Sequence, residues 1–198
     1  MRTTAEETEL MDKLILDAAI EVFSKVPYDS VNMQDIAEKA GVSRGPLYYR
    51  YKTKADLFRA AYNEYCVRKI DRYREIFSQD KPILERVRED MEYCLSGINL
   101  DEYIWLNNRG IRQAFPDLVD KSLEGEKAVF SMKVEAVRRA MEAGELRSDA
   151  DPNEIVNLIF IFAEGLFVLM NRQFTLTDEE LGARVDDLLD IIEKRYGV

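Results

Sequence analysis

The 198-residue sequence predicts an all-α fold of about nine helices. Apolar residues recur three and four positions apart over most of the chain, and the alternation typical of strands is nowhere sustained. Capping residues, prolines and glycines separate the periodic runs. The apolar content suffices for a core without disulfides, so Cys66 and Cys94 are expected to be reduced thiols.

Two helices are expected in the first forty residues. The first runs from about Leu10 and ends at Pro27, where the periodic pattern stops. Asn32 is a good N-cap for a short second helix, and Gly41 suits the left-handed residue that commonly follows a helix.

A third short helix is expected to follow directly. Ser43 would be its N-cap and Pro46 its third residue, where a missing N–H costs nothing because the first turn has no intrahelical acceptors. The Ser43 hydroxyl would then cap through the N–H of Gly45. Thr53 is expected to cap a long fourth helix, with Asp56 near its positive end.

The rest of the chain continues the helical pattern. Asp151 before a proline and Thr177 in a capping box are predicted helix starts. Gly125 is a candidate break inside the longest run. The remaining helices are expected over residues 83–98, 103–114, 116–144 and 152–171, and from residue 177 onward.

Histidine is absent from the chain. Its absence excludes histidine zinc sites, Ser-His-Asp triads, Cys-His dyads and di-iron sites with Glu-x-x-His motifs. We therefore expect no metal, no other cofactor and no enzymatic activity. In the least favoured alternative, a cysteine-dependent enzyme, Cys66 or Cys94 would be the nucleophile, but neither has a recognisable base beside it.

The longest apolar stretch, residues 155–170, is interrupted by Asn157 and Glu164 and falls short of a membrane span. No basic-then-apolar segment suggests export. The sequence therefore predicts a soluble, cytoplasmic protein.

Charge is distributed unevenly along the chain. The net charge of −10 argues against a nonspecific polyanion binder. Residues 41–60, however, carry a local charge of +4, whereas residues 1–40 carry −5. The basic residues of this segment are Arg44, Arg50, Lys52, Lys54 and Arg59.

Two short helices joined by the turn at residues 40–43 favour a helix-turn-helix. Arg44, at the tip of the second of these helices, would make a bidentate contact with guanine O6 and N7, and Gly45 would let the backbone come close to DNA. A solvated loop whose tyrosines pack on the core is the alternative. The groups expected to meet phosphates are Tyr48, Tyr49, Arg50, Lys52 and Lys54.

Two motifs lie between Leu14 and Phe58: ILDAAIEVFSK and VNMQDIAEKAGVSRGPLYYRYKTKADLF. Together they resemble the N-terminal domain of the TetR family of bacterial transcriptional regulators. The resemblance implies that Asn32 caps the second helix and touches a phosphate, and that Lys54 holds another. Arg50 departs from the family's usual aromatic residue, so its contact with a phosphate stays open. The residues that the resemblance turns toward DNA are Ser43, Arg44, Pro46, Tyr48 and Tyr49.

The resemblance implies a DNA-binding domain over residues 1–53 and a helical effector-binding and dimerisation domain over residues 54–198. The run 152–171 is apolar nearly all round, which predicts a second buried face and therefore a partner. A monomer that buries everything internally is the alternative. The residues expected at a homodimer interface are Ile155, Leu158, Ile159, Phe162, Leu166, Leu169, Leu181, Val185, Leu188 and Ile192.

A pocket for a small-molecule effector would lie among the middle helices, although ordinary core packing explains the same residues. The sequence thus predicts a repressor released from a near-palindromic DNA operator by its effector; a helical protein-interaction adaptor is the alternative. The candidate pocket residues are Tyr62, Tyr65, Tyr93, Trp105, Arg109, Phe130 and Phe162.

Overall fold

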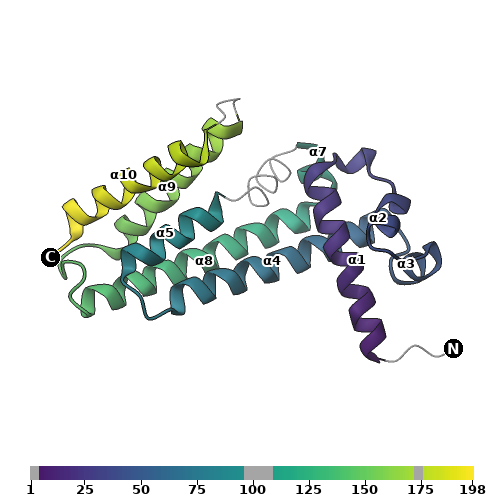
Figure 1. The fold of residues 1–198 in the computed structure, drawn as a ribbon, viewed down its shortest axis with the longest axis horizontal. Coiled ribbons are helices and arrows are strands. Elements are labelled where there is room, and N and C mark those ends of the chain that lie inside the picture. Colours follow the sequence, from purple (N-terminus) through teal and green to yellow (C-terminus); the bar gives the residue numbers. More distant parts are fainter. Residues whose placement is uncertain (1–4, 96–108, 172–175) are drawn as a thin grey trace. The chain divides into compact units, whose positions relative to one another are not determined.

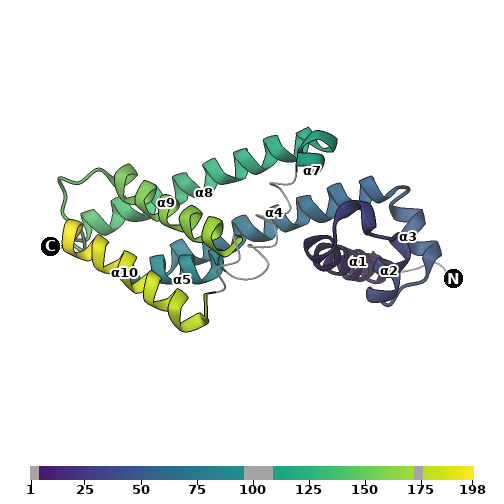
Figure 2. The same cartoon turned by 90° about the horizontal axis from the view of Figure 1, so that it is seen from above.

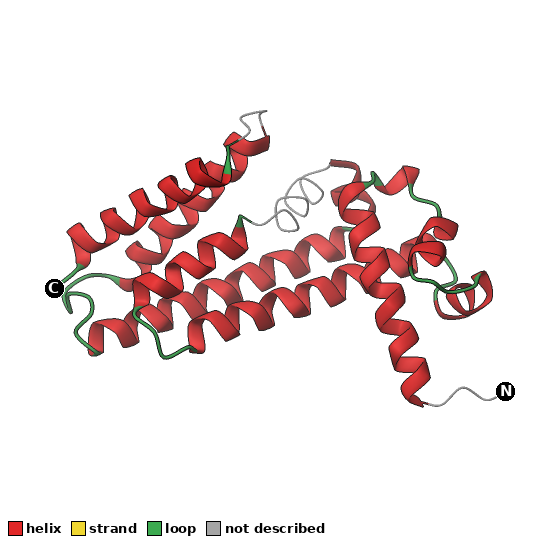
Figure 3. Cartoon of the chain, in the orientation of Figure 1, coloured by secondary structure: helices red, strands yellow, loops and turns green. Residues whose placement is uncertain are grey.

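A computed structural model describes residues 5–95, 109–171 and 176–198. These residues form nine α-helices and one short 3-10 helix. Figure 3 shows them as helices joined by loops, without a strand. The all-α class predicted from the sequence is confirmed.

The N-terminal helices follow the predicted boundaries closely, except that α1 begins at Ala5 and not at about Leu10. Thr53 and Asp56 form the expected reciprocal cap at the start of the fourth helix: the Asp56 N–H donates to Thr53 Oγ1 at 3.1 Å, and the Thr53 N–H donates to Asp56 Oδ2 at 3.0 Å. The elements are α1 (Ala5–Lys25), η1 (Tyr28–Ser30), α2 (Met33–Lys39), α3 (Arg44–Arg50) and α4 (Lys54–Ser78).

The C-terminal helices include one difference from the sequence analysis. Helix α8 runs through Gly125 without a break, because helical backbone tolerates an isolated glycine at a modest cost. The predicted stretches 96–98 and 103–108 lie outside the described residues. The elements are α5 (Ile83–Cys94), α7 (Arg109–Ala114), α8 (Pro116–Glu142), α9 (Pro152–Asn171) and α10 (Asp178–Tyr196).

The described residues group into two compact units. The first comprises those of 1–69 and 105–121, and contains α1, α2, α3 and α7 with the first parts of α4 and α8 (Figures 1 and 2). Its extent differs from the predicted domain of residues 1–53, because the early turns of α4 belong to the same core as α1 and α2. The α4 residues of this core are Leu57, Phe58, Ala61, Tyr62, Tyr65 and Cys66.

The second unit comprises the described residues of 70–104 and 122–198, in which α10 packs beside α5 (Figures 1 and 2). A buried ion pair lies in its core: Lys133 Nζ donates to Asp90 Oδ2 at 2.7 Å. The ammonium also lies 4.7–5.8 Å from the ring centroids of Tyr73, Phe77 and Phe160. Burial raises the pKa of Asp90, and the neighbouring ammonium opposes that rise.

The apolar residues of α9 and α10 divide between the core and the surface. Leu158, Phe162 and Leu181 are half-buried, and Leu169 is 45 % exposed. The other six predicted interface residues are buried inside the chain itself, and their place at a dimer interface stays a prediction. Periodicity alone does not reveal which side of an all-round apolar helix its own core covers. The six are Ile155, Ile159, Leu166, Val185, Leu188 and Ile192.

Helix α9 is also long and apolar enough to cross a membrane, with a mean hydropathy of 1.7 over Pro152–Met170. No other helix among the described residues meets this criterion. The apolar stretch that is too short by its sequence begins only at residue 155. A single helix of this kind is weak evidence for a membrane span, because core helices can have the same composition.

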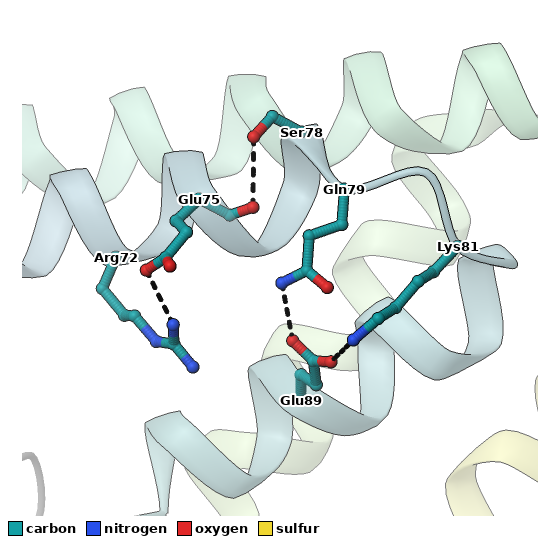
Figure 4. A network of polar contacts seen from close by, with 6 residues as sticks. All are labelled: Arg72, Glu75, Ser78, Gln79, Lys81 and Glu89. Atoms are coloured by element: carbon teal, nitrogen blue, oxygen red, sulfur yellow. Dashed lines mark hydrogen bonds and ion pairs between the residues drawn. The ribbon is translucent and has the colours of Figure 1, made fainter.

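A polar network connects the loop after α4 to α5 within the second unit (Figure 4). Gln79 Nε2 donates to Glu89 Oε2 at 2.8 Å, and Lys81 Nζ donates to the other oxygen of the same carboxylate. Arg72 forms a separate ion pair with Glu75, at 2.7 Å. The hydrogen bond from Lys81, followed by that from Gln79, lowers the pKa of Glu89.

Candidate nucleic-acid interface

Helices α2 and α3 are joined by the turn that the sequence predicts. Asn32 caps α2, with its side-chain oxygen accepting from the Gln34 N–H at 3.0 Å. Gly41 adopts φ 68°, and the next N–H, that of Val42, returns to the Ala37 carbonyl at 3.0 Å. This is the left-handed helix end that glycine favours. The helix-turn-helix is therefore built from local signals that the sequence contains.

Helix α3 starts after Ser43, as predicted, but the Ser43 side chain makes no capping hydrogen bond. The expected bond to the Gly45 N–H is therefore absent. Pro46 has no N–H to offer, and Ser43 is exposed, so water can satisfy the hydroxyl. A Cβ added at Gly45 would meet nothing within 4 Å, so this position leaves the helix surface open.

One side of α3 anchors it and the other side is exposed. Leu47 is fully buried in the first unit. Tyr48 and Tyr49 are 44 % and 78 % exposed, which is unusual for large aromatic side chains. Lys52 is exposed, and its ammonium lies 5.2 Å from the Tyr49 ring centroid. The exposed side therefore combines aromatic rings, hydroxyl groups and a cation.

Arg44, at the first position of α3, is held by a side chain of α2. Its Nε donates to Gln34 Oε1, and Gln34 Nε2 donates to Glu38 Oε1 at 2.6 Å. Gln34 and Glu38 were not among the predicted site residues. The sequence does place Gln34 and Glu38 one turn apart on α2, where their side chains can meet. Only the fold, however, brings Gln34 to Arg44.

Two other cations of the basic segment are paired within the protein. Arg50 donates to Asp12 and to the Thr8 carbonyl on α1, which answers the question left open by the sequence: its guanidinium turns toward α1. Arg59 donates to Asp117. The local charge of +4 is thus partly compensated by acids from outside the segment.

Lys54 is held by the segment before α2, which consists of η1 and the residues after it. Its ammonium donates to the carbonyls of Tyr28 at 2.7 Å, Val31 at 3.0 Å and Asp29 at 3.3 Å. It also lies 4.6 Å from the Tyr28 ring centroid. An ammonium has three donors, so a phosphate contact would require Lys54 to leave these carbonyls.

The candidate pocket residues divide between the two units. Tyr62 and Tyr65 lie in the first, with ring centroids 6.4 Å apart. In the second unit, Tyr93 packs edge-on against Tyr73, and the ring centroids of Phe130 and Phe160 lie 5.6 Å apart.

These two contacts place Tyr93 and Phe130 beside the rings that surround Lys133. Phe162 is half-buried against the same core. Trp105 lies outside the described residues, and Arg109 is the first residue of α7.

An all-helical chain with this turn between two short helices is a helix-turn-helix protein. Residues 15–61 match the family model of bacterial regulatory proteins of the tetR family. The matched segment contains the helix-turn-helix and resembles the N-terminal domain of that family.

The chain is similar to the HTH-type transcriptional regulator AcrR of Shigella flexneri, with 40 % identity over 57 residues. That match covers 29 % of this chain and about a quarter, 26 %, of AcrR.

Two solved structures share the fold over nearly the whole chain. A TetR-family regulator from Mesorhizobium loti aligns with a TM-score of 0.81 at 17 % identity, covering 99 % of this chain and all of that one. A transcriptional regulator from Saccharomonospora viridis, solved in complex with choline, aligns with a TM-score of 0.74 at 21 % identity. The alignment covers 94 % of this chain and 97 % of that one.

Proposed function

We propose that the chain is a DNA-binding transcriptional regulator, a cytoplasmic repressor released from a near-palindromic operator by a small-molecule effector. The exposed side of α3 is the observation that carries this proposal. It holds Arg44, Tyr48 and Tyr49 on the second helix of a helix-turn-helix, with Lys52 just after it. The match of residues 15–61 to the family model of bacterial regulatory proteins supports the same function.

Arg44 would read a base, since a guanidinium can donate two hydrogen bonds to guanine O6 and N7. Tyr48, Tyr49 and Lys52 would contact phosphates and fix the register of the helix on DNA. Contacts from Asn32, which caps α2, and from Ser43, Gly45 and Pro46 at the start of α3 also belong to the proposal.

Fluorescence anisotropy would test this function with duplex DNA flanking the protein's own gene and with random-sequence duplex, at several salt concentrations. Arg44→Ala should remove the preference for the specific duplex. Lys52→Ala should weaken binding to both duplexes and reduce the salt slope by about 1. Lys127→Ala, which changes an exposed lysine of α8, is the matched control. Wild-type protein that prefers no sequence, even in a genome-wide selection, would contradict the proposal.

We also propose that the chain is a homodimer. Helix α9 exposes Ile161 by 70 %, Leu169 by 45 % and Val168 by 37 %, and a second copy would cover these residues. The α3 helices of the two copies would then contact two DNA half-sites about 34–36 Å apart. Sedimentation equilibrium should give a dimer for the wild type and a monomer for Ile161→Glu. Val67→Glu, at another exposed apolar residue, should remain dimeric.

We propose further that the effector binds near the Lys133–Asp90 pair, where the predicted pocket residues Tyr93 and Phe130 flank the aromatic cluster. The three rings already hold the Lys133 ammonium, so the effector would bind beside this cluster and not between the rings. The S. viridis relative with bound choline supports testing choline first. Choline should release DNA from the wild type and not from Phe160→Ala. DNA affinity that is unchanged at all choline concentrations would exclude this ligand.

A further inference from the structure

Gln34 connects the two helices of the helix-turn-helix at the residue proposed to read a base. Its side-chain oxygen accepts from Arg44 Nε, and its side-chain nitrogen donates to Glu38. The carboxylate of Glu38 can only accept, so it requires the NH₂ end of the amide. The oxygen of Gln34 is thereby directed to Arg44, and the amide has one favoured orientation.

This arrangement leaves part of the Arg44 guanidinium available. The Nε donor is used by Gln34, whereas no hydrogen bond holds either terminal nitrogen among the described residues. The two terminal nitrogens form the edge that can donate in parallel to guanine O6 and N7. Gln34 therefore binds the side of the guanidinium that this type of base contact does not need.

Holding the side chain before DNA arrives also reduces the entropy lost on binding. An arginine loses rotamer freedom when it is fixed at an interface. Arg44 is exposed, so no core packing restricts it. A hydrogen bond from the neighbouring helix can supply that restriction in the free protein.

We propose that Gln34, oriented by Glu38, is a specificity-determining residue that positions Arg44 to read a guanine. The inference rests on the proposed DNA-binding function and deepens it. Gln34 acts through Arg44 as a positioning residue and contributes no charge. Removing it should therefore change the preference for a base without changing the number of phosphates neutralised.

The test is a selection from a random-sequence duplex library, carried out in parallel with wild type, Arg44→Ala, Gln34→Ala and Glu38→Ala. A guanine position should lose about 5- to 150-fold of its preference in Arg44→Ala. The same position should lose about 2- to 10-fold in Gln34→Ala, the scale of ordering one flexible side chain. Glu38→Ala should give a smaller loss there.

Gln113→Ala is the matched control, because Gln113 is an exposed glutamine of α7. Its selected sequences should equal those of the wild type. Urea unfolding of each variant separates loss of fold from loss of preference, and the salt slope of Gln34→Ala should equal the wild-type slope.

The outcomes separate this inference from the function on which it rests. Wild-type protein that enriches no sequence would remove the proposed function itself. Wild-type protein that enriches a guanine, together with Gln34→Ala that enriches it equally, would overturn only the role of Gln34. A shallower salt slope in Gln34→Ala would also overturn it, because a positioning role predicts no loss of phosphate contacts.

Discussion

Lys54 in the first unit and Lys133 in the second both place an ammonium near an aromatic ring, but their oxygen partners differ. Lys54 donates to three backbone carbonyls, which are dipoles and leave its positive charge uncancelled. Lys133 donates to the carboxylate of Asp90, and the pair is neutral and buried. Lys54 therefore fixes the segment around η1 beside the candidate DNA-binding surface. Lys133 neutralises the buried carboxylate of Asp90 in the core.

The largest effect is expected when the buried pair is broken. Asp90→Ala should lower the free energy of unfolding by about 3–5 kcal/mol, because it leaves the Lys133 ammonium without its counter-charge in the core. Urea unfolding measures this difference. The control is Asp186→Ala, which removes the exposed partner of Arg88 and should cost about 0–1 kcal/mol. Equal losses in the two variants would mean that burial adds nothing to the importance of the pair.

Lys54→Met should have the next largest effect. It removes the charged donor shared by the three carbonyls, and a hydrogen bond to a charged group contributes about 1.5–3 kcal/mol. We expect a loss of about 2–3 kcal/mol in urea unfolding, since the exposed part of the loop can be rehydrated. Lys52→Met should leave stability nearly unchanged.

The same two variants distinguish a structural lysine from a phosphate contact. DNA affinity should fall in both. The salt slope should decrease by about 1 in Lys52→Met and stay at the wild-type value in Lys54→Met. A slope that decreases equally in Lys54→Met would show that its ammonium leaves the carbonyls for a phosphate.

The behaviour of Lys54 also illustrates what the sequence could and could not predict. The caps at Asn32 and Thr177 and the turn at Gly41 were predicted correctly, because each depends on residues close together in the chain. The carbonyls that hold Lys54 lie 23 to 26 residues earlier. The sequence therefore predicted a phosphate contact for Lys54, which stays a prediction, but not the carbonyls that hold its ammonium.

The same limit applies to the candidate site and to the core. Gln34 and Arg44 are ten residues apart on different helices, and only the turn between them brings the side chains together. Periodicity showed that α9 is apolar on more than one side, but it did not show that Ile155 and Ile159 face the chain's own core while Ile161 is exposed. Long-range contacts decide these cases.

A smaller effect is expected when both members of the buried pair are replaced. Asp90→Leu combined with Lys133→Met should lie within about 1–2 kcal/mol of the wild type, because apolar residues of similar size avoid the cost of desolvating two charges. Urea unfolding of the double variant and of each single variant gives the coupling between the two sites. A double variant as unstable as Asp90→Ala would indicate that packing, and not charge, explains the loss.

The smallest effect concerns the half-buried network around Glu89 in Figure 4 and depends on pH. Lys81 and Gln79 lower the pKa of Glu89 below its usual value of 4.5 in the folded state. Above the unfolded-state pKa the interaction is fully present. As pH falls, the unfolded chain binds the proton first, so this contribution to stability is lost as the pH passes through the folded-state pKa.

Glu89→Gln should therefore lose less stability than the wild type between neutral and acidic pH. The control is Glu92→Gln, on the same helix, whose stability should depend on pH as that of the wild type does. If Glu89→Gln also shows the wild-type pH dependence, the network does not couple stability to protonation of Glu89.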